Sequence, residues 1–274
     1  MQVDGRVNPP FDPGACDRGE YCDVRELEEL RERRAYECRL RPDRALTTID
    51  EAERFLRDRG MLTRTTDSAL PSLFEACHEE PYAPDSPGFG QWPRTKFPWF
   101  GELGARGYPI LAVHRGKSLL VTPEIMRSLD PVCRPELERM EAEDTAWARL
   151  LRHLGEAGPS ELEDLQLELG LKPKELRQLR SPLERFGAVV SRSIVYEDPH
   201  RHTSELCRWD HLMPEPAKGG GLADLVVAAV RAAVVAPEEQ VPRWFSWPWE
   251  GGLVDRLVED GRLVRPEDGW LAAP

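Results

Sequence analysis

Three segments with the apolar spacing of amphipathic helices, followed by two strand-like segments, succeed one another in the second half of the chain. The helical segments cover 145–156, 160–169 and 173–186, and turns containing glycine or proline separate them. A β-branched run at 188–196, a polar loop and a second extended segment near 205–209 complete the pattern. Three helices and a terminal hairpin in this order predict a winged helix, a unit whose third helix enters the major groove of DNA.

Two local features bear on the ends of these helices. Ser160 stands three residues before Glu163, which predicts a capping box at the start of the second helix. Pro182 lies inside the third helix, where a proline removes an amide donor and clashes with the preceding turn. We therefore expect the third helix to kink or restart at Pro182.

The third helix has a polar, basic face opposite its apolar stripe. We expect duplex DNA to be contacted by the residues of this face, Lys174, Arg177, Gln178 and Arg185. Arg192 and Arg201 of the hairpin are expected on phosphates, and Lys117 of an earlier hairpin is expected in the same interface. The net charge of -12 argues against binding by bulk electrostatics, but residues 172–192 hold six Lys and Arg against two Glu. Any contact with nucleic acid is therefore expected to be local and sensitive to salt.

We predict an α+β chain that is mainly helical and built from tandem winged helices with small hairpin wings. Residues 1–23, rich in Pro, Gly and Asp, are expected to form a loose arm. Residues 24–140 are interpreted as a helical, winged-helix-like domain with a hairpin and an aromatic loop at 79–109. Residues 141–213 form the central winged helix. Residues 222–274 repeat its pattern more loosely with an acidic third helix and a terminal hairpin, which indicates a packing module.

Within the N-terminal domain, local signals predict several elements. Thr48 and Glu51 form a capping box that opens a helix, and Gly60 ends it. The other expected elements are a solvated helix lying on the body, a second short helix and two strands, at 24–40, 71–77, 110–113 and 118–121.

The composition excludes several classes of protein. No stretch reaches the roughly 20 apolar residues needed to cross a bilayer, and the first residues lack the apolar core of a secretory signal. Six cysteines without C-x-x-C spacing and the scattered His200, His202 and His211 do not form a metal-ligand pattern. We expect a cytoplasmic monomer with reduced, mostly buried thiols that binds no membrane, no metal and no small-molecule cofactor.

Several short motifs occur in an order that resembles a known family. They are Gly60-Met61-Leu62, Phe97-Pro98-Trp99, Gly116-Lys117, Arg208-Trp209-Asp210 and Arg243-Trp244-Phe245. With the central winged helix, they make the chain from about residue 50 onward similar to the winged-helix DNA glycosylases of the AlkZ and YcaQ type, nearest to the AlkZ-related proteins. The resemblance implies tandem winged helices around a concave basic channel and excision of alkylated or crosslinked bases. Apart from the resemblance, Arg208 and Asp210 are expected to form an ion pair beside a buried Trp209.

Glycosylases of this family use a Gln-x-Gln or Gln-x-Asp pair, which suits a reaction that needs positioned water beside an oxocarbenium-like sugar. The resemblance places that pair in 63–67, where this chain has no glutamine. Asp67 is then the candidate catalytic residue, with Arg64 and Thr66 lining the pocket, although Asp67 equally suits a cap for a following helix. Three functions stay open: a monofunctional DNA glycosylase, a non-catalytic DNA-binding regulator and a protein-protein interaction module.

Overall fold

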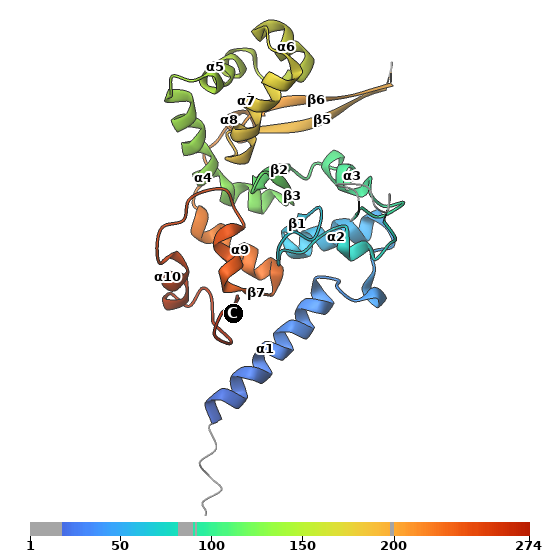
Figure 1. Ribbon diagram of the computed structural model, residues 1–274, viewed down its shortest axis with the longest axis vertical. Coiled ribbons are helices and arrows are strands. Elements are labelled where there is room, and N and C mark those ends of the chain that lie inside the picture. Colours follow the sequence, from blue (N-terminus) through green and yellow to red (C-terminus); the bar gives the residue numbers. More distant parts are fainter. Residues whose placement is uncertain (1–17, 82–89, 91, 198–199) are drawn as a thin grey trace, which may run out of the picture.

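The computed structural model describes residues 18–81, 90, 92–197 and 200–274, with their side chains except at 18–25, 195–197 and 200–202. Within these ranges the chain is α+β and mainly helical, as predicted, with small antiparallel sheets (Figure 1). The elements form an elongated stack, with a projecting hairpin near one end and the helix α1 (Arg18–Glu37) at the other. No helix in the described part of the chain has both the length and the hydropathy required to span a bilayer.

The central unit contains three helices and a three-stranded sheet. Its elements are α5 (Ala146–Ala157), β4 (Ser160–Glu161), α6 (Leu162–Leu169), α7 (Pro173–Arg185), β5 (Val189–Glu197) and β6 (His200–Arg208). β6 lies in the middle of the sheet and is antiparallel to both β4 and β5. The three helices and the hairpin follow one another in the order that the sequence predicts.

Leucines at helical spacing hold the central unit together. Six of them are buried in one cluster: Leu150, Leu151, Leu154, Leu165, Leu176 and Leu183. Leu176 and Leu183 lie two turns apart on α7, so this helix turns one face to the core and the opposite face to solvent. β2 (Ile110–His114) packs against both α7 and β5 and connects the central unit to the N-terminal part of the chain.

Two details of the central unit differ from the predictions. Ser160 does not cap α6, because it belongs to β4, pairs with Leu206 and donates its hydroxyl to the Gly158 carbonyl oxygen over 3.0 Å. The helix α6 consequently begins at Leu162. The helix α7 does not restart at Pro182, since this proline lies in the last turn, where it removes only one helical hydrogen bond.

The N-terminal part contains a second three-stranded sheet. Its elements are η1 (Pro42–Arg44), α2 (Ile49–Arg59), β1 (Met61–Thr63), η2 (Glu75–Cys77), α3 (Trp99–Ala105), β2 and β3 (Lys117–Val121), with β3 between β1 and β2. Thr48 caps α2 by accepting from the Glu51 amide over 3.2 Å, and Gly60 ends the helix at φ 79°, as predicted. The helix predicted at 71–77 is only the 3-10 turn η2. The predicted aromatic loop contains a helix, α3, which starts where Trp99 and Phe100 turn onto the core.

A long helix, α4 (Pro123–Ala142), joins these parts to the C-terminal module. It packs against α5, α8 (Trp209–Leu212) and α9 (Leu222–Ala233). The module continues with β7 (Val235–Pro237), η3 (Glu238–Arg243), α10 (Leu253–Glu259) and β8 (Trp270–Ala272). The strand β8 pairs with β7. The hairpin predicted at the end of the chain is represented only by one isolated bridge, between Val264 and Ala272.

The helix α1 rests on the C-terminal module. It begins at Arg18, so the loose arm predicted for 1–23 is wrong at 18–23, while residues 1–17 lie outside the described part. Leu27 is buried against Val235 and Ala272. The sequence predicts a solvated helix lying on the body, and most described side chains of α1 are indeed exposed or half-buried. The cavity that α1 closes on one side was not predicted.

The triplet Arg208-Trp209-Asp210 fastens the central unit to α4. Arg208 is ion-paired with Asp210 and with Glu141, and Trp209 is fully buried, as predicted. The indole Nε1 of Trp209 donates to the Asp130 carboxylate over 2.7 Å. This buried bond fixes the orientation of the unit that carries α7.

Candidate functional site

The solvent-facing side of α7 carries the cations that the sequence predicts for DNA contact. Its exposed residues include Lys174, Arg177, Gln178 and Arg185. None of the three cations among them forms an ion pair with any described residue. Pro173 at the first helical position and the Glu175 carboxylate, which accepts from the Lys172 amide over 2.8 Å, set the start of the helix. One face of α7 therefore presents to solvent three cationic side chains, without ion pairs among the described residues, and the carboxamide of Gln178.

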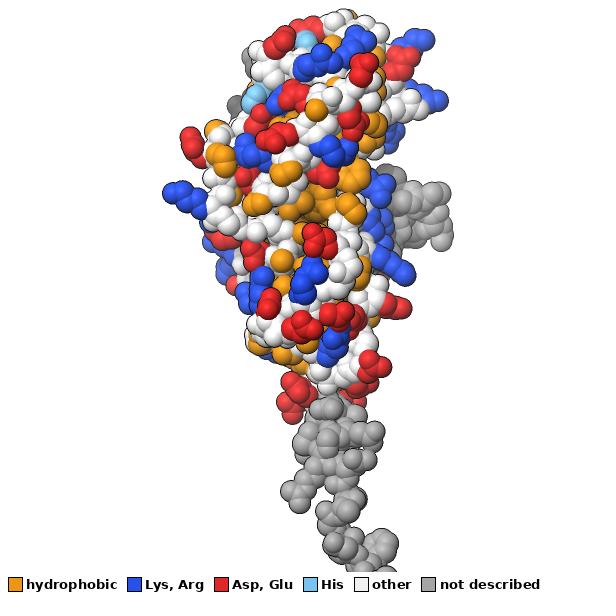
Figure 2. Space-filling view, turned by 90° about the vertical axis from the view of Figure 1, so that its left-hand side faces the viewer, with side chains coloured by type: hydrophobic (Ala, Val, Ile, Leu, Met, Phe, Trp, Pro, Cys, Tyr) orange, Lys and Arg blue, Asp and Glu red, His pale blue; other side chains and the backbone are white. Residues whose placement is uncertain are grey.

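Many arginines elsewhere contact carboxylates. In the described chain these include Arg106, Arg139, Arg208, Arg262 and Arg265. Figure 2 shows acidic and basic side chains interspersed over the side of the molecule where α4, α5 and α10 lie. On α7, Arg180 likewise pairs with Glu184, whereas Lys174, Arg177 and Arg185 have no carboxylate partner among the described residues.

Two other residues predicted to contact DNA are neutralised. Arg192 pairs with Glu205 across the β5–β6 hairpin, and Lys117 pairs with Asp67. The side chain of Arg201 lies outside the described residues, although the β5–β6 hairpin itself extends from the body (Figure 1). Of the predicted DNA contacts whose side chains the structure describes, only those on α7 are exposed without an ion pair to another described residue.

Asp67 lies in the irregular segment after β1. Its carboxylate accepts from the Thr65 hydroxyl over 2.8 Å and binds Lys117, and its carbonyl oxygen accepts from Arg115 over 2.9 Å. Burial by itself would raise the pKa of Asp67, but the hydrogen bonds from Lys117 and Thr65 outweigh burial and lower this pKa below its ordinary value. Asp67 is thus a carboxylate whose oxygens are already bound by Lys117 and Thr65. No helix begins directly after Asp67, so the prediction that Asp67 caps a following helix is wrong.

Arg64 and Thr66 do not join Asp67 in one pocket. The Arg64 guanidinium lies 4.8 Å from the ring centre of Phe100 and 5.3 Å from that of Trp92, in the aromatic cluster beside α3. Thr66 is exposed. The structure therefore does not assemble the three candidate catalytic residues as the resemblance implies.

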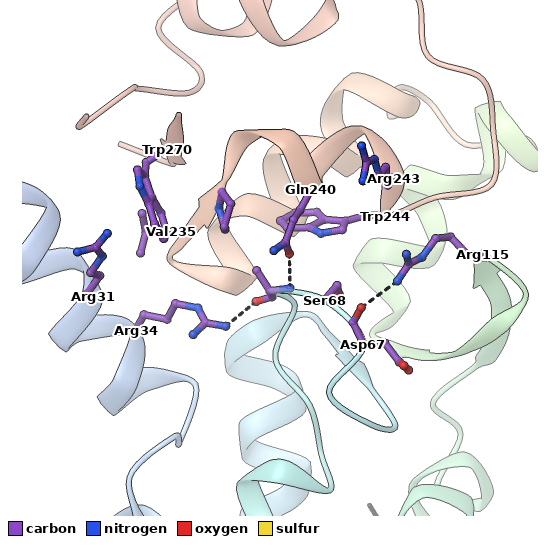
Figure 3. A pocket seen from close by; sticks show the side chains of 12 residues that line it. Arg31, Arg34, Asp67, Ser68, Arg115, Val235, Gln240, Arg243, Trp244 and Trp270 are labelled. Atoms are coloured by element: carbon purple, nitrogen blue, oxygen red, sulfur yellow. Dashed lines mark hydrogen bonds between the residues drawn. The ribbon is translucent and has the colours of Figure 1, made fainter. Parts of the chain in front are cut away.

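A cavity of about 630 Å³ opens beside Asp67 (Figure 3). Its walls come from α1, the segment 67–69, the β2–β3 turn, η3 and β8. Most of its polar lining is cationic or amide in character, from Arg31, Arg34, Arg115, Arg243 and Gln240. Asp67 is the only acidic residue among the described residues that line it, and Lys117 neutralises that charge.

His114 lies behind the Ser68 side of this cavity and is fully buried. Its Nδ1 lies 2.6 Å from the Trp244 carbonyl oxygen, which assigns a proton to Nδ1 and leaves Nε2 as an acceptor, 3.5 Å from the Ser68 hydroxyl. Burial lowers the pKa of His114 from 6.5 to about 4. The ring is therefore neutral near pH 7.

The buried His114 is expected to make stability depend on pH. Below about pH 6.5 the unfolded chain takes up a proton that the folded chain refuses until about pH 4, so the free energy of unfolding falls as the pH drops through this range. Between pH 7 and pH 5 the expected loss is about 2 kcal/mol. Urea unfolding at pH 7, 6 and 5 measures it, and His114→Asn should show a shallower dependence. Parallel pH profiles for the two proteins would contradict the assignment.

Four of the six cysteines have side chains that the structure describes. Cys38, Cys77, Cys133 and Cys207 are free and buried, as predicted, and burial raises the pKa of each thiol. No group of three or more His, Cys, Asp or Glu side chains suited to a metal ion occurs in the described part of the chain. The side chains of His200 and His202 fall outside it.

Comparisons with protein-family models, with curated proteins and with solved structures found no significant match. The geometry of the α7 face and of the cavity therefore carries the functional argument.

Sequence reasoning missed the arginines of the cavity. Arg31 and Arg34 share a face of α1 at i,i+3 spacing, but Arg115 comes from a turn and Arg243 from η3, and no spacing rule relates these two to α1. Two of these arginines could have been noticed because they lie at the short motifs of the family resemblance. Arg115 precedes Gly116-Lys117, and Arg243 is the first residue of Arg243-Trp244-Phe245.

Proposed function

We propose that this chain binds duplex DNA, with α7 lying in the major groove and the β5–β6 hairpin beside the neighbouring backbone. The observation that carries the proposal is the exposed face of α7, whose Lys174, Arg177 and Arg185 are free of ion pairs within the described residues. These solvent-exposed cations can meet the phosphates of a polyanion, which would replace counterions around them and give local binding on an otherwise acidic molecule.

The residue types on this face suit contact with base edges as well as phosphates. An arginine such as Arg177 can donate two hydrogen bonds to guanine, and a glutamine such as Gln178 can pair with the donor and acceptor of adenine. Lys174, near the helix N-terminus, suits a phosphate contact. We therefore propose that α7 recognises the major groove and that a few nearby contacts with the DNA phosphates support it, so that no broad basic surface is needed.

Base excision is not part of the proposal. An alkylated base that leaves readily is cationic, and a cavity lined by four guanidinium groups repels a cation. The Asp67 carboxylate, which would have to face the sugar cation, is already bound by Lys117 and Thr65. We therefore favour a DNA-binding protein of the non-catalytic kind.

Duplex binding is tested by fluorescence anisotropy with a labelled 25-base-pair duplex. The triple variant Lys174→Gln, Arg177→Gln, Arg185→Gln should bind roughly 30- to 100-fold more weakly and reduce the slope of log K against log salt by about 2–3. Arg149→Gln is the matched control, because Arg149 is an exposed arginine on α5 without an ion pair in the described chain. It should bind like the wild type.

Equal affinities for the triple variant and the control would overturn α7 as the reading helix. Absence of duplex binding by the wild type at low salt would overturn the proposal and favour a protein-protein interaction module. The same preparations are assayed for abasic sites in methylated duplex. Base release that disappears in Asp67→Asn would restore the glycosylase activity implied by the family resemblance.

A further inference from the structure

We infer that the cavity between α1, the β2–β3 turn, η3 and β8 binds a phosphate monoester of nucleotide size. This site is separate from the α7 face and does not depend on the proposed function. Figure 3 shows its arginines arranged around one opening, with Arg31 and Arg34 on α1 and Arg115 and Arg243 on the opposite side.

The four guanidinium groups have no counter-charge of their own. Within the described residues none of them is paired with a carboxylate, whereas Arg208 and Arg265 each bind two. Like charges around one cavity repel one another, and an anion bound between them removes that cost. The arrangement therefore favours an anionic occupant.

Three of the four arginines are held in place by contacts with neighbouring residues yet keep donors to spare. Arg34 donates to the Ala69 carbonyl oxygen over 3.0 Å, and Arg115 donates to that of Asp67 over 2.9 Å. The Arg31 guanidinium lies 4.5 Å from the ring centre of Trp270. Each guanidinium has five N–H groups, so single contacts of this kind orient the side chain and leave most of its donors for a ligand.

Neutral donors belong to the same wall. The Gln240 amide oxygen accepts from the Ala69 amide over 3.2 Å, which leaves the Gln240 amide nitrogen with two protons to donate. The indole N–H of Trp244 is buried and has no hydrogen-bond partner in the described chain. A buried donor without a partner in a cavity wall is a second observation that favours an acceptor-rich occupant.

The size and the residue types narrow the ligand class. Planar guanidinium forks match the oxygens of phosphate, and several forks around one point suit a terminal phosphate with two charges. About 630 Å³ is much more than a phosphate ion needs and lies within the range of small-molecule sites. Trp244 and Trp270 give the remaining space flat walls that suit a ring. A free nucleotide and the 5′-phosphorylated end of a nucleic acid strand share this chemistry.

The test is titration calorimetry on the full chain with adenosine 5′-monophosphate and with adenosine. We expect the monophosphate to bind at least tenfold more tightly than adenosine, and Arg115→Gln, Arg243→Gln to abolish this preference. Both arginines are exposed, so the double variant is expected to fold. Arg149→Gln and the triple variant of α7 should keep the preference, which separates failure of this site from failure of duplex binding.

Equal affinity for adenosine and its monophosphate, or an unchanged preference in the double variant, would overturn the inference. Competition then identifies the source of the phosphate. Displacement of a labelled monophosphate by a duplex with 5′-phosphates, but not by the same duplex without them, would assign the site to a strand end. Displacement by neither duplex would assign it to a free phosphate ester.

Discussion

Replacing Trp209 with alanine is expected to lower the free energy of unfolding by about 3–5 kcal/mol. The indole is fully buried between the central unit and α4, so its removal leaves a cavity. It also takes away a 2.7 Å hydrogen bond to Asp130, a carboxylate that is 2% exposed. Among the described residues, Arg134 and the Ala217 amide would remain as its donors. Loss of volume and loss of a donor to a buried charge act in the same direction.

Urea unfolding of Trp209→Ala and Trp209→Phe separates these two contributions. Phenylalanine keeps most of the apolar volume and lacks only the N–H, so we expect a loss of about 1–3 kcal/mol for this variant. A soluble but unfolded alanine variant beside a folded phenylalanine variant would agree with the larger figure. A loss below about 1 kcal/mol for alanine would show that this junction contributes little to stability.

Replacing Gly187 with alanine is expected to cost about 2–4 kcal/mol. Gly187 connects α7 to β5 at φ 75°, a conformation that L residues rarely adopt. A Cβ atom there would overlap the Cys133 sulfur of α4 and would lie 3.2 Å from the Cys133 Cβ and 3.5 Å from Val113. Both the backbone conformation and the close packing against α4 therefore exclude a side chain.

Gly170→Ala is the matched control for this prediction. Gly170 has φ 65°, and a Cβ atom added there would meet no other atom within 4 Å, so its substitution carries only the backbone cost of about 1 kcal/mol. Cys133→Ala in the same chain as Gly187→Ala should recover part of the loss, because the sulfur is the atom that is overlapped. Equal losses for the two glycine variants, or strict additivity with Cys133→Ala, would show that no clash exists.

Several elements follow from local pattern alone. The Thr48 cap and the Gly60 terminus define α2, Pro173 opens α7, and alternating residues give the hairpin β2–β3. These signals act through neighbours in sequence, so tertiary packing does not need to be known. Predictions were wrong where contacts with residues far away in the sequence determine the local secondary structure. Ser160 has a good capping sequence but is drawn into a strand by Leu206, and 18–23 become helical in a segment composed like a loose arm.

The exposed basic face of α7 was readable from sequence, because helical spacing alone places Lys174, Arg177 and Arg185 opposite the buried leucines. Which cations stay free was decided only by tertiary structure, since Arg192 and Lys117 meet Glu205 and Asp67 through strand pairing and a turn. The cavity was likewise beyond sequence reasoning, because its walls come from opposite ends of the chain. The spacing of residues along one helix determines which side chains share a face. Ion pairs and cavities, in contrast, depend on contacts between residues that are distant in sequence and meet only in the folded chain.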